Sequence, residues 1–571
     1  MTTSPSPDNI VDVAIIGGGV SGAYTAYRLM KTDPGESPVL QEILNRSGKE
    51  KLDVRLIEMS DRIGGRLWSI DVPGLPNLPA EMGGVSFSRF QCNVYGLCTQ
   101  ELGLETKRSR SKSHLQYFRG HHFWPGDYEP LVDPTHLRDD YYPSVVPFFL
   151  EEDEKWQYPG RLLGRLFDHV NGFNYPMALA NNFMENLSLN EKYFITEINQ
   201  IINGMTIVLR QAKLYDQPLY EHGFWNVIVK LLSPDACNLI QTTAALYQIS
   251  NNHNLYNYST SIMRQNIFNR SYSALTEGYD KLPKTLVNKF EQVGGTVYTQ
   301  TQLLSLNSEQ YNEEQLIKLT LGSSTGELRA DLYARHVVLA LPQRALKLLS
   351  NDSSNIFGNN QLDLLDTVTA YPAQKLILAY DNLWWEQVKR PGRLGEAAKP
   401  ITDGSSITDL PVNACYYIGE ENRQDGLLMA LLDDTIEGFW SHLRPSAGPN
   451  SWLNPESYID PNSKMVMEAQ RQLKELHQIN IPDPTAGLFW DWKDDPFGGG
   501  WHLWNPGVKS WEVASKIRQP NCNVNVFVCG EAYSEQQGWV EGALNSAEMM
   551  LEEHFELPRP NWVPNSYKFG L

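Results

Sequence analysis

A glycine-rich turn near the start of the chain has the spacing of a nucleotide-binding turn. Gly17, Gly19 and Gly22 follow the apolar run 11–16 and precede the helix-compatible segment 23–30. Glycines at this spacing let the backbone approach a pyrophosphate, and the helix that follows directs its positive end at the phosphates. The same turn can also serve only to pack a helix on a sheet. A ligand site therefore needs support from other residues.

A second strand-like run, 52–59, supplies that support. It contains Glu58, a carboxylate that can accept a hydrogen bond from a ribose hydroxyl in a dinucleotide-binding unit. The connecting segment 31–51 is rich in Pro, Gly, Ser and charge, and we expect it to carry a surface insertion. The unit predicts a dinucleotide site. FAD and NAD both use it, so the choice between them depends on other residues.

Three further motifs lie far apart in the chain and separate the two cofactors. They are the loop 62–66 (RIGGR), the loop 80–84 (AEMGG) and the C-terminal segment 529–544. In this order they resemble the motifs of the flavin amine oxidase family, which includes monoamine, polyamine and L-amino acid oxidases. The resemblance covers nearly the whole chain at the level of motifs. It implies FAD as the cofactor.

The resemblance also implies which residues surround the FAD. Gly65 and Arg66 are expected along the pyrophosphate and ribityl chain, with the backbone of 80–84 against the isoalloxazine ring. Glu531 is expected to accept from ribityl or ribose hydroxyls, and N–H groups at Val540 to stabilise negative charge at the flavin N1/O2 edge. The full set of expected cofactor-binding residues is Gly17, Gly19, Val20, Ser21, Gly22, Glu58, Gly65, Arg66, Met82, Gly83, Gly84, Leu303, Trp492, Gly530, Glu531, Gly538, Trp539, Val540 and Ala543.

The FAD is expected to be bound without a covalent link. Membrane monoamine oxidases carry a flavin-linking cysteine after a pair of glycines, and this chain has Trp501 after Gly499 and Gly500. The chain therefore departs from that branch of the family at the residue on which the link depends.

Lys375 is the first candidate for chemistry at the flavin. It lies in the strand-like run 374–380 with apolar neighbours on both faces. In the family, a lysine on such a strand holds a water against flavin N5, and the resemblance assigns Lys375 to reoxidation by O2, where a cation stabilises developing negative charge. The alternative is a lysine that extends from an edge strand to solvent. The other expected catalytic residues are Trp539, which could wall the substrate pocket, Gly538, Arg89 and Tyr417.

The substrate class follows from a second resemblance. The segment 402–411 with the pair 416–417 is similar to the substrate-domain stretch of L-amino acid oxidases more than to that of other branches. We therefore expect oxidative deamination of an L-amino acid by O2 to a 2-oxo acid, ammonia and hydrogen peroxide. An alternative is an amine or polyamine oxidase whose substrate lacks an α-carboxylate. Another is a flavin-binding redox module without oxidase turnover.

Several positions depart from the L-amino acid oxidase pattern. Ser86 aligns with an arginine that grips the substrate carboxylate, and Arg89 replaces it only if the loop has a different shape. A tyrosine of the family is replaced near Leu431, and a histidine proposed as a base aligns with Gln265. Ser86 favours the alternative of an amine without a carboxylate.

A mixed fold must bring these separated residues together. We predict an α/β chain (α+β overall) with a discontinuous Rossmann-type FAD-binding domain, a mixed-sheet substrate domain and a helical insertion. Strands are predicted at 374–380, 414–418 and 426–432, and a final strand at 524–529 leads into a helix at 540–554. The predicted boundaries are 8–86, 276–345 and 519–556 for the FAD-binding domain, 87–150 and 346–518 for the substrate domain, 151–275 for the helical domain and 557–571 for a tail.

Composition limits the partners. The 571 residues carry a net charge of -19, which opposes binding to nucleic acid or to an anionic membrane, so a small-molecule substrate with O2 is expected. No signal peptide or membrane-spanning run is seen, and we expect a cytoplasmic homodimer. The six cysteines have no CxxC or CxxH spacing, so free, mostly buried thiols and no metal site are expected.

Overall fold

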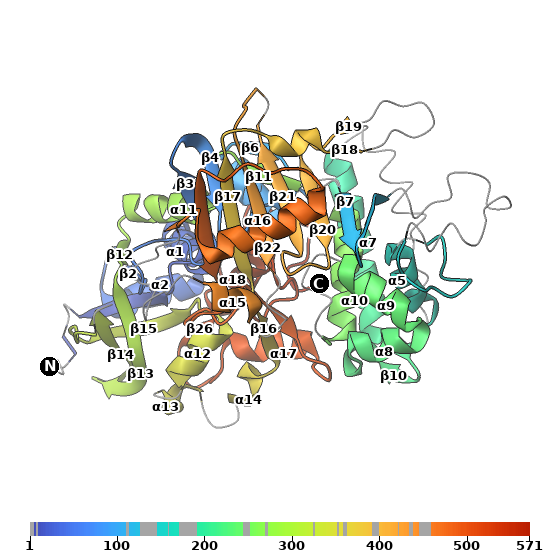
Figure 1. Ribbon diagram of the computed structural model, residues 1–571. Helices are drawn as coiled ribbons and strands as arrows, with labels where there is room; N and C mark the ends of the chain where they lie inside the picture. The colour runs from blue at the N-terminus through green and yellow to red at the C-terminus, as the bar shows by residue number, and fades with distance from the viewer. Residues whose placement is uncertain are drawn as a thin grey trace.

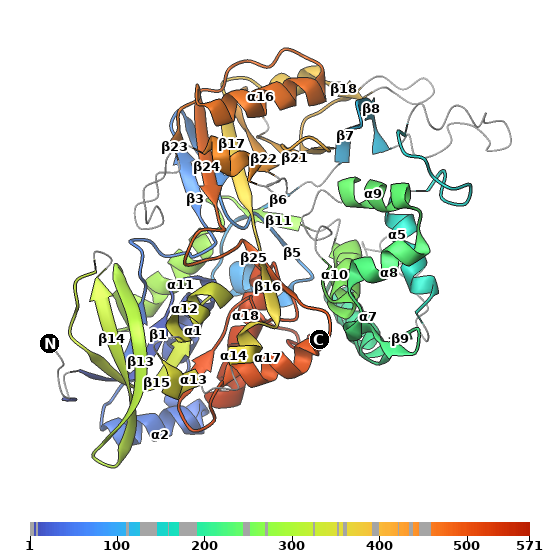
Figure 2. The same cartoon turned by 60° about the horizontal axis from the view of Figure 1, so that its bottom comes forward.

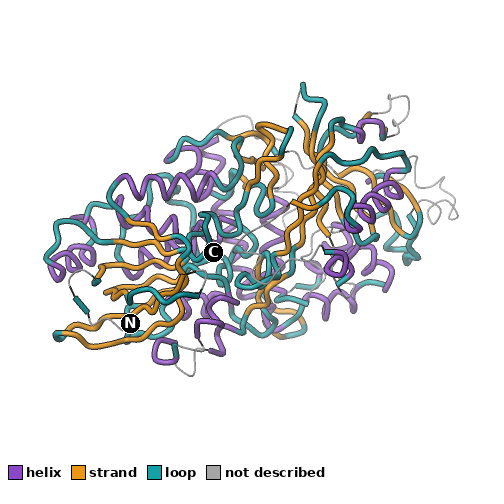
Figure 3. The backbone as a smooth tube through the Cα atoms, turned by 60° about the vertical axis from the view of Figure 1, so that its left-hand side comes forward, coloured by secondary structure: helices purple, strands orange, loops and turns teal. Residues whose placement is uncertain are grey.

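The computed structural model describes residues 5–6, 9–109, 113–125, 146–157, 159–170, 191–243, 252–268, 272–323, 326–350, 353–357, 362–390, 399–420, 422–432, 438–444 and 458–571. Two large sheets and a group of helices form the molecule (Figure 1). In Figure 3 the strands lie in two groups, with helices around them. The predicted mixed α/β class is confirmed.

The first sheet has seven strands taken from distant parts of the chain. Its order is β12 (Thr296–Tyr298), β2 (Val54–Ile57), β1 (Ile10–Ile16), β15 (Leu332–Leu339), β14 (Glu314–Ser323) and β13 (Thr301–Tyr311), and β26 (Val526–Val528) also pairs with β15. All seven residues of β1 are buried because helices and loops cover both faces of a parallel strand. The strand β15 joins the segments: it pairs in parallel with β1 and β26 and antiparallel with β14.

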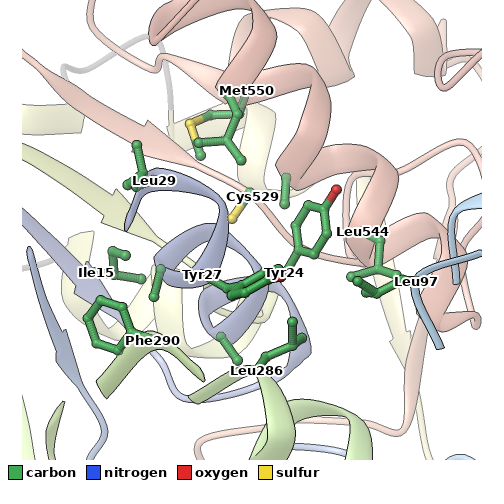
Figure 4. Close-up of a cluster of buried hydrophobic side chains, with 14 of the residues drawn as sticks. Ile15, Tyr24, Tyr27, Leu29, Leu97, Leu286, Phe290, Cys529, Leu544 and Met550 are labelled. Carbon is green, nitrogen blue, oxygen red and sulfur yellow. The ribbon is translucent and has the colours of Figure 1, made fainter. Parts of the chain in front are cut away.

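Helices from the two ends of the chain pack together beside this sheet. Figure 4 shows Tyr24 of α1 (Val20–Lys31) with Leu286 of α11 (Lys281–Gln292) and Leu544 and Met550 of α18 (Val540–His554) in one buried cluster. The guanidinium of Arg28 on α1 also donates to Glu548 on α18 at 2.7 Å, and both side chains are buried. The final helix is thereby held against the glycine-rich turn.

The second sheet has eight strands and two differently covered faces. Its order is β23 (Tyr458–Ile459), β24 (Ala486–Asp491), β17 (Gln374–Tyr380), β22 (Gly426–Leu432), β21 (Ala414–Gly419), β20 (Gly404–Thr408), β7 (Ser113–Phe118) and β8 (His121–Phe123). Helix α16 (Lys464–His477) packs on the face that carries Leu376 and Leu378, while Ile377 and Ala379 face β4 (Leu75–Glu81) and Trp490 of β24. Successive side chains of β17 therefore alternate between α16 and the interior of the molecule.

A third part is helical. Helices α5 (Pro159–Asp168), α7 (Glu191–Gln211), α8 (Phe224–Leu231), α9 (Pro234–Thr243) and α10 (Leu255–Phe268) lie together at one side of the sheets, as Figure 2 shows. They share one hydrophobic core that includes Leu162, Leu209, Phe224, Ile240 and Leu255. This core agrees with the helical periodicity of the sequence.

The connection between β1 and β2 beyond α1 is more regular than a loop. It contains the 3-10 turn η1 (Pro34–Glu36) and the helix α2 (Pro38–Ser47). The side chain of Ser37 accepts from the backbone N–H of Leu40 at 3.0 Å, and Pro38 occupies the first helical position, so this short segment begins a helix despite its turn-like composition.

Shorter elements complete the chain. They are β3 (Ser69–Val72), β5 (Phe87–Ser88), α3 (Cys92–Gly96), η2 (Leu97–Glu101), β6 (Thr106–Arg108), β9 (Lys213–Leu214), β10 (Gln217–Pro218), η5 (Leu219–Glu221), β11 (Tyr272–Leu275), α12 (Gln343–Ser350), α13 (Ser354–Phe357), α14 (Leu362–Leu365), β16 (Val368–Tyr371), η7 (Trp384–Gln387), β18 (Lys389–Arg390), β19 (Lys399–Pro400), α15 (Phe439–Leu443), β25 (Trp501–Trp504) and α17 (Ser510–Arg518). Across the described ranges, none of the helices has the length and hydropathy needed to cross a membrane. All six cysteines are free, and all but Cys522 are buried.

Candidate functional site

A cavity of about 1200 Å³ lies between the two sheets. This volume exceeds the roughly 300–1,000 Å³ of ordinary ligand pockets, so it has room for a large cofactor together with a small substrate. Eighteen of the residues predicted for the site line it: Gly17, Gly19, Val20, Ser21, Glu58, Gly65, Arg66, Gly83, Gly84, Leu303, Lys375, Trp492, Gly530, Glu531, Gly538, Trp539, Val540 and Ala543. Gly22, Met82, Arg89 and Tyr417 are not among its lining residues.

The glycine-rich turn combines a closed side and an open side. A Cβ added to Gly22 would lie 1.9 Å from the carbonyl oxygen of Gly17, so Gly22 packs the helix on the strand and does not face the cavity. A Cβ added to Gly19 would meet only the Cα of Gly65 within 4 Å, at 3.8 Å. Helix α1 begins at Val20 without a side-chain cap. Its first N–H groups therefore face a cradle that suits a phosphate.

Glu58 closes one end of the cradle. Its Oε2 accepts from the backbone N–H of Gly18 at 2.6 Å, and its Oε1 accepts from both the N–H and the hydroxyl of Ser60 at 2.8 and 2.7 Å. A carboxylate has about four acceptor positions. One position thus remains for a hydroxyl of a ligand.

The loop 62–66 lies directly on the glycine-rich turn. Gly64 donates its N–H to the carbonyl of Gly18 at 2.9 Å, and the guanidinium of Arg62 donates to the carbonyl of Gly65 at 2.8 Å. Gly65 has φ of +57°, and an added Cβ would lie 3.0 Å from the Cα of Gly19. Glycine is needed at this position because the backbone is left-handed and its neighbour is backbone.

Glu531 lines the cavity, but its carboxylate is already fully bonded within the protein. One oxygen accepts from the N–H groups of His502 and Gly538 at 2.9 and 2.8 Å, and the other accepts from Arg66 and the His502 ring at 2.8 Å each. Burial raises the pKa of Glu531, but Arg66 and His502 outweigh it and lower the pKa to about 2. These four bonds make Glu531 an organiser of its neighbours, and its role as an acceptor for ribityl or ribose hydroxyls stays a prediction.

Lys375 is buried at the centre of the second sheet. It lies on β17, which is flanked by β22 and β24, so an edge-strand lysine reaching to solvent is ruled out. Its ammonium donates to the carbonyls of Glu81 and Gly83, which leaves one of its three N–H groups. Burial lowers the pKa of Lys375 to about 8, against the attraction of the Glu81 carboxylate. A cation is thereby fixed in the cavity wall.

The loop 80–84 is clamped between the two sheets. A Cβ added to Gly83 would lie 1.9 Å from the carbonyl oxygen of Arg66, so this loop packs on the loop 62–66. The indole N–H of Trp492 donates to the carbonyl of Met82 at 2.8 Å. The side chain of Met82 is buried in the cluster behind the cavity and supports the loop from there.

The two tyrosines of β21 face opposite ways. Tyr417 packs on the α16 side of the sheet, where its hydroxyl donates to Ser406 and bonds with the ring of His477, each at 2.6 Å. Tyr416 lines the cavity instead. The prediction of Tyr417 at the site is therefore wrong in its direction: successive side chains of a strand point to opposite faces, and Tyr416 is the one that faces the cavity.

Arg89 does not replace the missing carboxylate-binding arginine. Its guanidinium lies over the ring of Phe90 at 5.2 Å from the centroid, away from the cavity lining, whereas Ser86 does line the cavity. Leu431 and Gln265 also line the cavity. The loop at 86–90 therefore lacks the shape that a role for Arg89 requires.

The part of the cavity around Trp539, called the substrate end below, is aromatic and polar. Trp539 stacks on Tyr272, with ring centroids 5.8 Å apart and planes within 5°. Gln116, Thr243 and Ser405 add uncharged polar groups to the lining. Tyr272 could not be identified as a site residue from the sequence, because it contacts Trp539 only through the tertiary fold and belongs to no local motif.

The chain matches a family model and several curated proteins along its length. The family is described as flavin containing amine oxidoreductase, and its model matches residues 21–549. Aplysianin-A from Aplysia kurodai is 22% identical over 572 residues, covering 96% of this chain and 91% of that protein. Achacin from Lissachatina fulica is 25% identical over 572 residues, with 96% and 94% covered. L-amino-acid oxidase 4 from Hebeloma cylindrosporum is 21% identical over 603 residues, with 99% and 84% covered.

Solved structures share the fold. A putrescine oxidase bound to putrescine superposes with a TM-score of 0.58 at 15% identity, covering 95% of this chain and 98% of that chain. Cyclohexylamine oxidase from Brevibacterium oxydans has a TM-score of 0.58 at 16% identity, covering 95% and 99%. At these identities the likeness concerns the fold alone.

Proposed function

This chain belongs to the flavin-containing amine oxidoreductases, and we propose that within this family it catalyses the oxidative deamination of an L-amino acid. The products would be a 2-oxo acid, ammonia and hydrogen peroxide, with O2 as the second substrate. The family accounts for an oxidoreductase with a flavin cofactor, whereas the amino acid is our inference.

The residues of the cavity fit a flavin dinucleotide, FAD, held without a covalent link. The open side of Gly19 and the uncapped start of α1 suit its pyrophosphate, and the remaining acceptor position of Glu58 suits a ribose hydroxyl. The start of α18 at Val540 also lines the cavity and suits negative charge. We propose these groups, with Gly65, Arg66 and Gly530, as the cofactor site.

A bound flavin supplies a two-electron acceptor for the C–H bond next to the substrate amine. The protein then has to bind the amine, orient its C–H bond and exclude water. Trp539 and Tyr272 form a rigid stacked wall for this purpose. Lys375 holds a proton and a positive charge at the cavity surface, where it stabilises negative charge that develops on oxygen during reoxidation.

The choice among amine substrates depends on where the carboxylates of the cavity lining lie. Among the described residues that line the cavity, the only carboxylates are Glu58 and Glu531, and both are bonded to backbone groups at the cofactor end. A polyamine has at least two ammonium groups, and the distant one needs an acidic partner. The uncharged substrate end favours a substrate with a single amine, as most amino acids have.

Similarity supports the amino acid over a simple amine. One of the relatives that span most of the chain is named L-amino-acid oxidase 4. The alternative is an amine without a carboxylate, which Ser86 favours because a serine stands in the cavity wall where the family's amino acid oxidases have an arginine. The structural neighbours named putrescine oxidase and cyclohexylamine oxidase act on such amines.

A peroxide-release screen tests the proposal. The purified yellow protein is offered L-amino acids, D-amino acids, monoamines and polyamines, and peroxide and ammonia are measured together. We expect both products in equal amounts with at least one L-amino acid. Peroxide from amines alone would establish the alternative. A flavin that no compound bleaches anaerobically would indicate a redox module without turnover.

A further inference from the structure

A second, small cavity lies behind the wall of the substrate end. Its volume is about 40 Å³, and it shares Gln265 and Trp539 with the main cavity. Arg264, the neighbour of Gln265 on α10, lines the small cavity. A single water needs roughly 10–15 Å³, so the space is sufficient for a polar group of a few atoms.

Arg264 is a buried cation with donors that lack acceptors. The residue is 5% exposed, and its Nε and Nη2 atoms are buried without a hydrogen-bond partner among the described residues. The nearby Arg210, by contrast, has acceptors: it donates to the hydroxyl of Tyr256 at 3.0 Å and to the carbonyl of Gly570 at 2.6 Å. Leaving buried guanidinium donors unpaired is costly. The unpaired Nε and Nη2 therefore indicate a missing acceptor.

The geometry of these two donors suits one class of ligand. Nε and Nη2 lie on the same edge of the planar guanidinium, and this edge forms two parallel bonds to a carboxylate. Glu535 lines the same cavity: its Oε2 accepts from Tyr256 at 3.5 Å, and its Oε1 is buried without a hydrogen-bond partner among the described residues. Burial raises the pKa of Glu535, against the lowering effect of the nearby cations Arg210 and Arg264.

We propose that Arg264 binds the carboxylate of the amino acid substrate. This assignment rests on the proposed function, and it supplies the cation that Ser86 and Arg89 do not. A substrate whose amine-bearing carbon lies beside Trp539 in the main cavity can extend its carboxylate between Trp539 and Gln265 toward the unpaired edge of Arg264. Arg264 thereby selects amino acids over amines that have the same side chain.

Paired substrates test this role in the complete flavoprotein. Arg264→Met is compared with the wild type for the best L-amino acid of the screen and for the amine that differs from it only by loss of the carboxylate. Anaerobic bleaching of the flavin gives the dissociation constant of each. We expect Arg264→Met to raise the dissociation constant of the amino acid about 30-fold or more, as for a buried charged pair that loses one partner. The dissociation constant of the amine should change by no more than about threefold. Equal effects on both compounds would overturn the assignment.

Binding of benzoate separates this proposal from the proposed function. The wild type should bind benzoate with a change in the flavin spectrum, and Arg264→Met should bind it about 30-fold more weakly. If the wild type oxidises only amines but Arg264→Met still loses benzoate, the proposed function fails and the carboxylate site stands. If the wild type does not bind benzoate, or both proteins bind it equally, the carboxylate site is refuted.

Two further variants control for folding. Arg46→Met removes an exposed arginine on α2 and should leave the dissociation constants of both compounds unchanged. Arg264→Lys keeps the charge but loses the paired N–H groups of the guanidinium edge. It should therefore weaken binding of the amino acid by an intermediate factor and leave binding of the amine unchanged. If Arg264→Met is not recovered as a yellow folded protein, the same comparison with Arg264→Lys decides, and equal effects on both compounds again count against the proposal.

Discussion

Arg66 and Glu531 form an ion pair of 2.8 Å although they stand 465 positions apart in the chain. The pair joins the loop after β2 to the turn after β26, which are neighbours only because β1 and β26 both pair with β15. It also holds His502 and the backbone N–H of Gly538, so one carboxylate aligns both ends of the chain around the cavity.

Replacing Glu531 by Gln tests this arrangement. Removing the charge leaves Arg66 with a weaker partner, and we expect the dissociation constant for FAD to rise about tenfold or more, measured by the flavin absorbance retained on dialysis. Glu512→Gln, on the exposed side of α17, should retain FAD like the wild type. Unchanged retention in Glu531→Gln would contradict the role.

The same carboxylate gives the protein an acid-labile contribution to stability. Burial and the opposing effect of Arg66 and His502 leave the pKa of Glu531 at about 2, below its ordinary 4.5. A lowered carboxylate pKa stabilises the fold above pH 4.5, and this contribution is lost as the pH falls through about 2. The difference in unfolding free energy between the wild type and Glu531→Gln should therefore shrink over this range, followed by urea denaturation. A constant difference would refute the assignment.

Replacing Lys375 by Met should separate the two half-reactions. The variant loses the cation in the cavity wall, so reoxidation by O2 should slow about 100-fold while reduction by the substrate changes only a few-fold. Stopped-flow measurements of each half-reaction check this. Lys464→Met, an exposed change on α16, serves as the control. Equal slowing of both half-reactions would exclude the assigned role.

Glu81 should set the pH at which Lys375 acts. Because burial lowers the pKa of Lys375 to about 8 and the Glu81 carboxylate opposes this, the lysine is charged below about pH 8 and neutral above it. The reoxidation rate should fall as the pH rises through about 8. Glu81→Gln removes the opposing charge and should move this fall to lower pH, whereas the exposed Glu291→Gln should not move it. A fall that stays in place would show that the two groups are not linked.

The two tyrosines of β21 offer a matched comparison. Tyr417→Phe should lower the unfolding free energy by about 1 kcal/mol, through lost bonds to Ser406 and His477, and leave KM unchanged. Tyr416→Phe should change KM with little effect on stability, because Tyr416 lines the cavity. Thermal denaturation and steady-state kinetics of both variants decide. The reverse pattern would mean that the strand faces the other way.

The local elements and the family could be predicted from residues that are close together in the chain. The glycine-rich turn, the strands at 374–380 and 426–432 and the helix at 540–554 depend on spacing and hydrophobic runs that neighbours in the chain impose. The resemblance to flavin amine oxidases is confirmed over residues 21–549 because it rests on such local motifs. The domain boundaries and the homodimer stay predictions.

Which side chains share a space depends on contacts between segments that are distant in the chain. Nothing local distinguishes Tyr416 from Tyr417, because the direction of each depends on which face of β21 meets α16. Glu531 could be recognised from its motif as a site residue. The motif did not show that Arg66, His502 and Gly538 occupy its acceptor positions. Arg264 belongs to no sequence motif, so the sequence did not identify it. Its unpaired donors arise from burial among distant segments, and burial is a property of the packed chain.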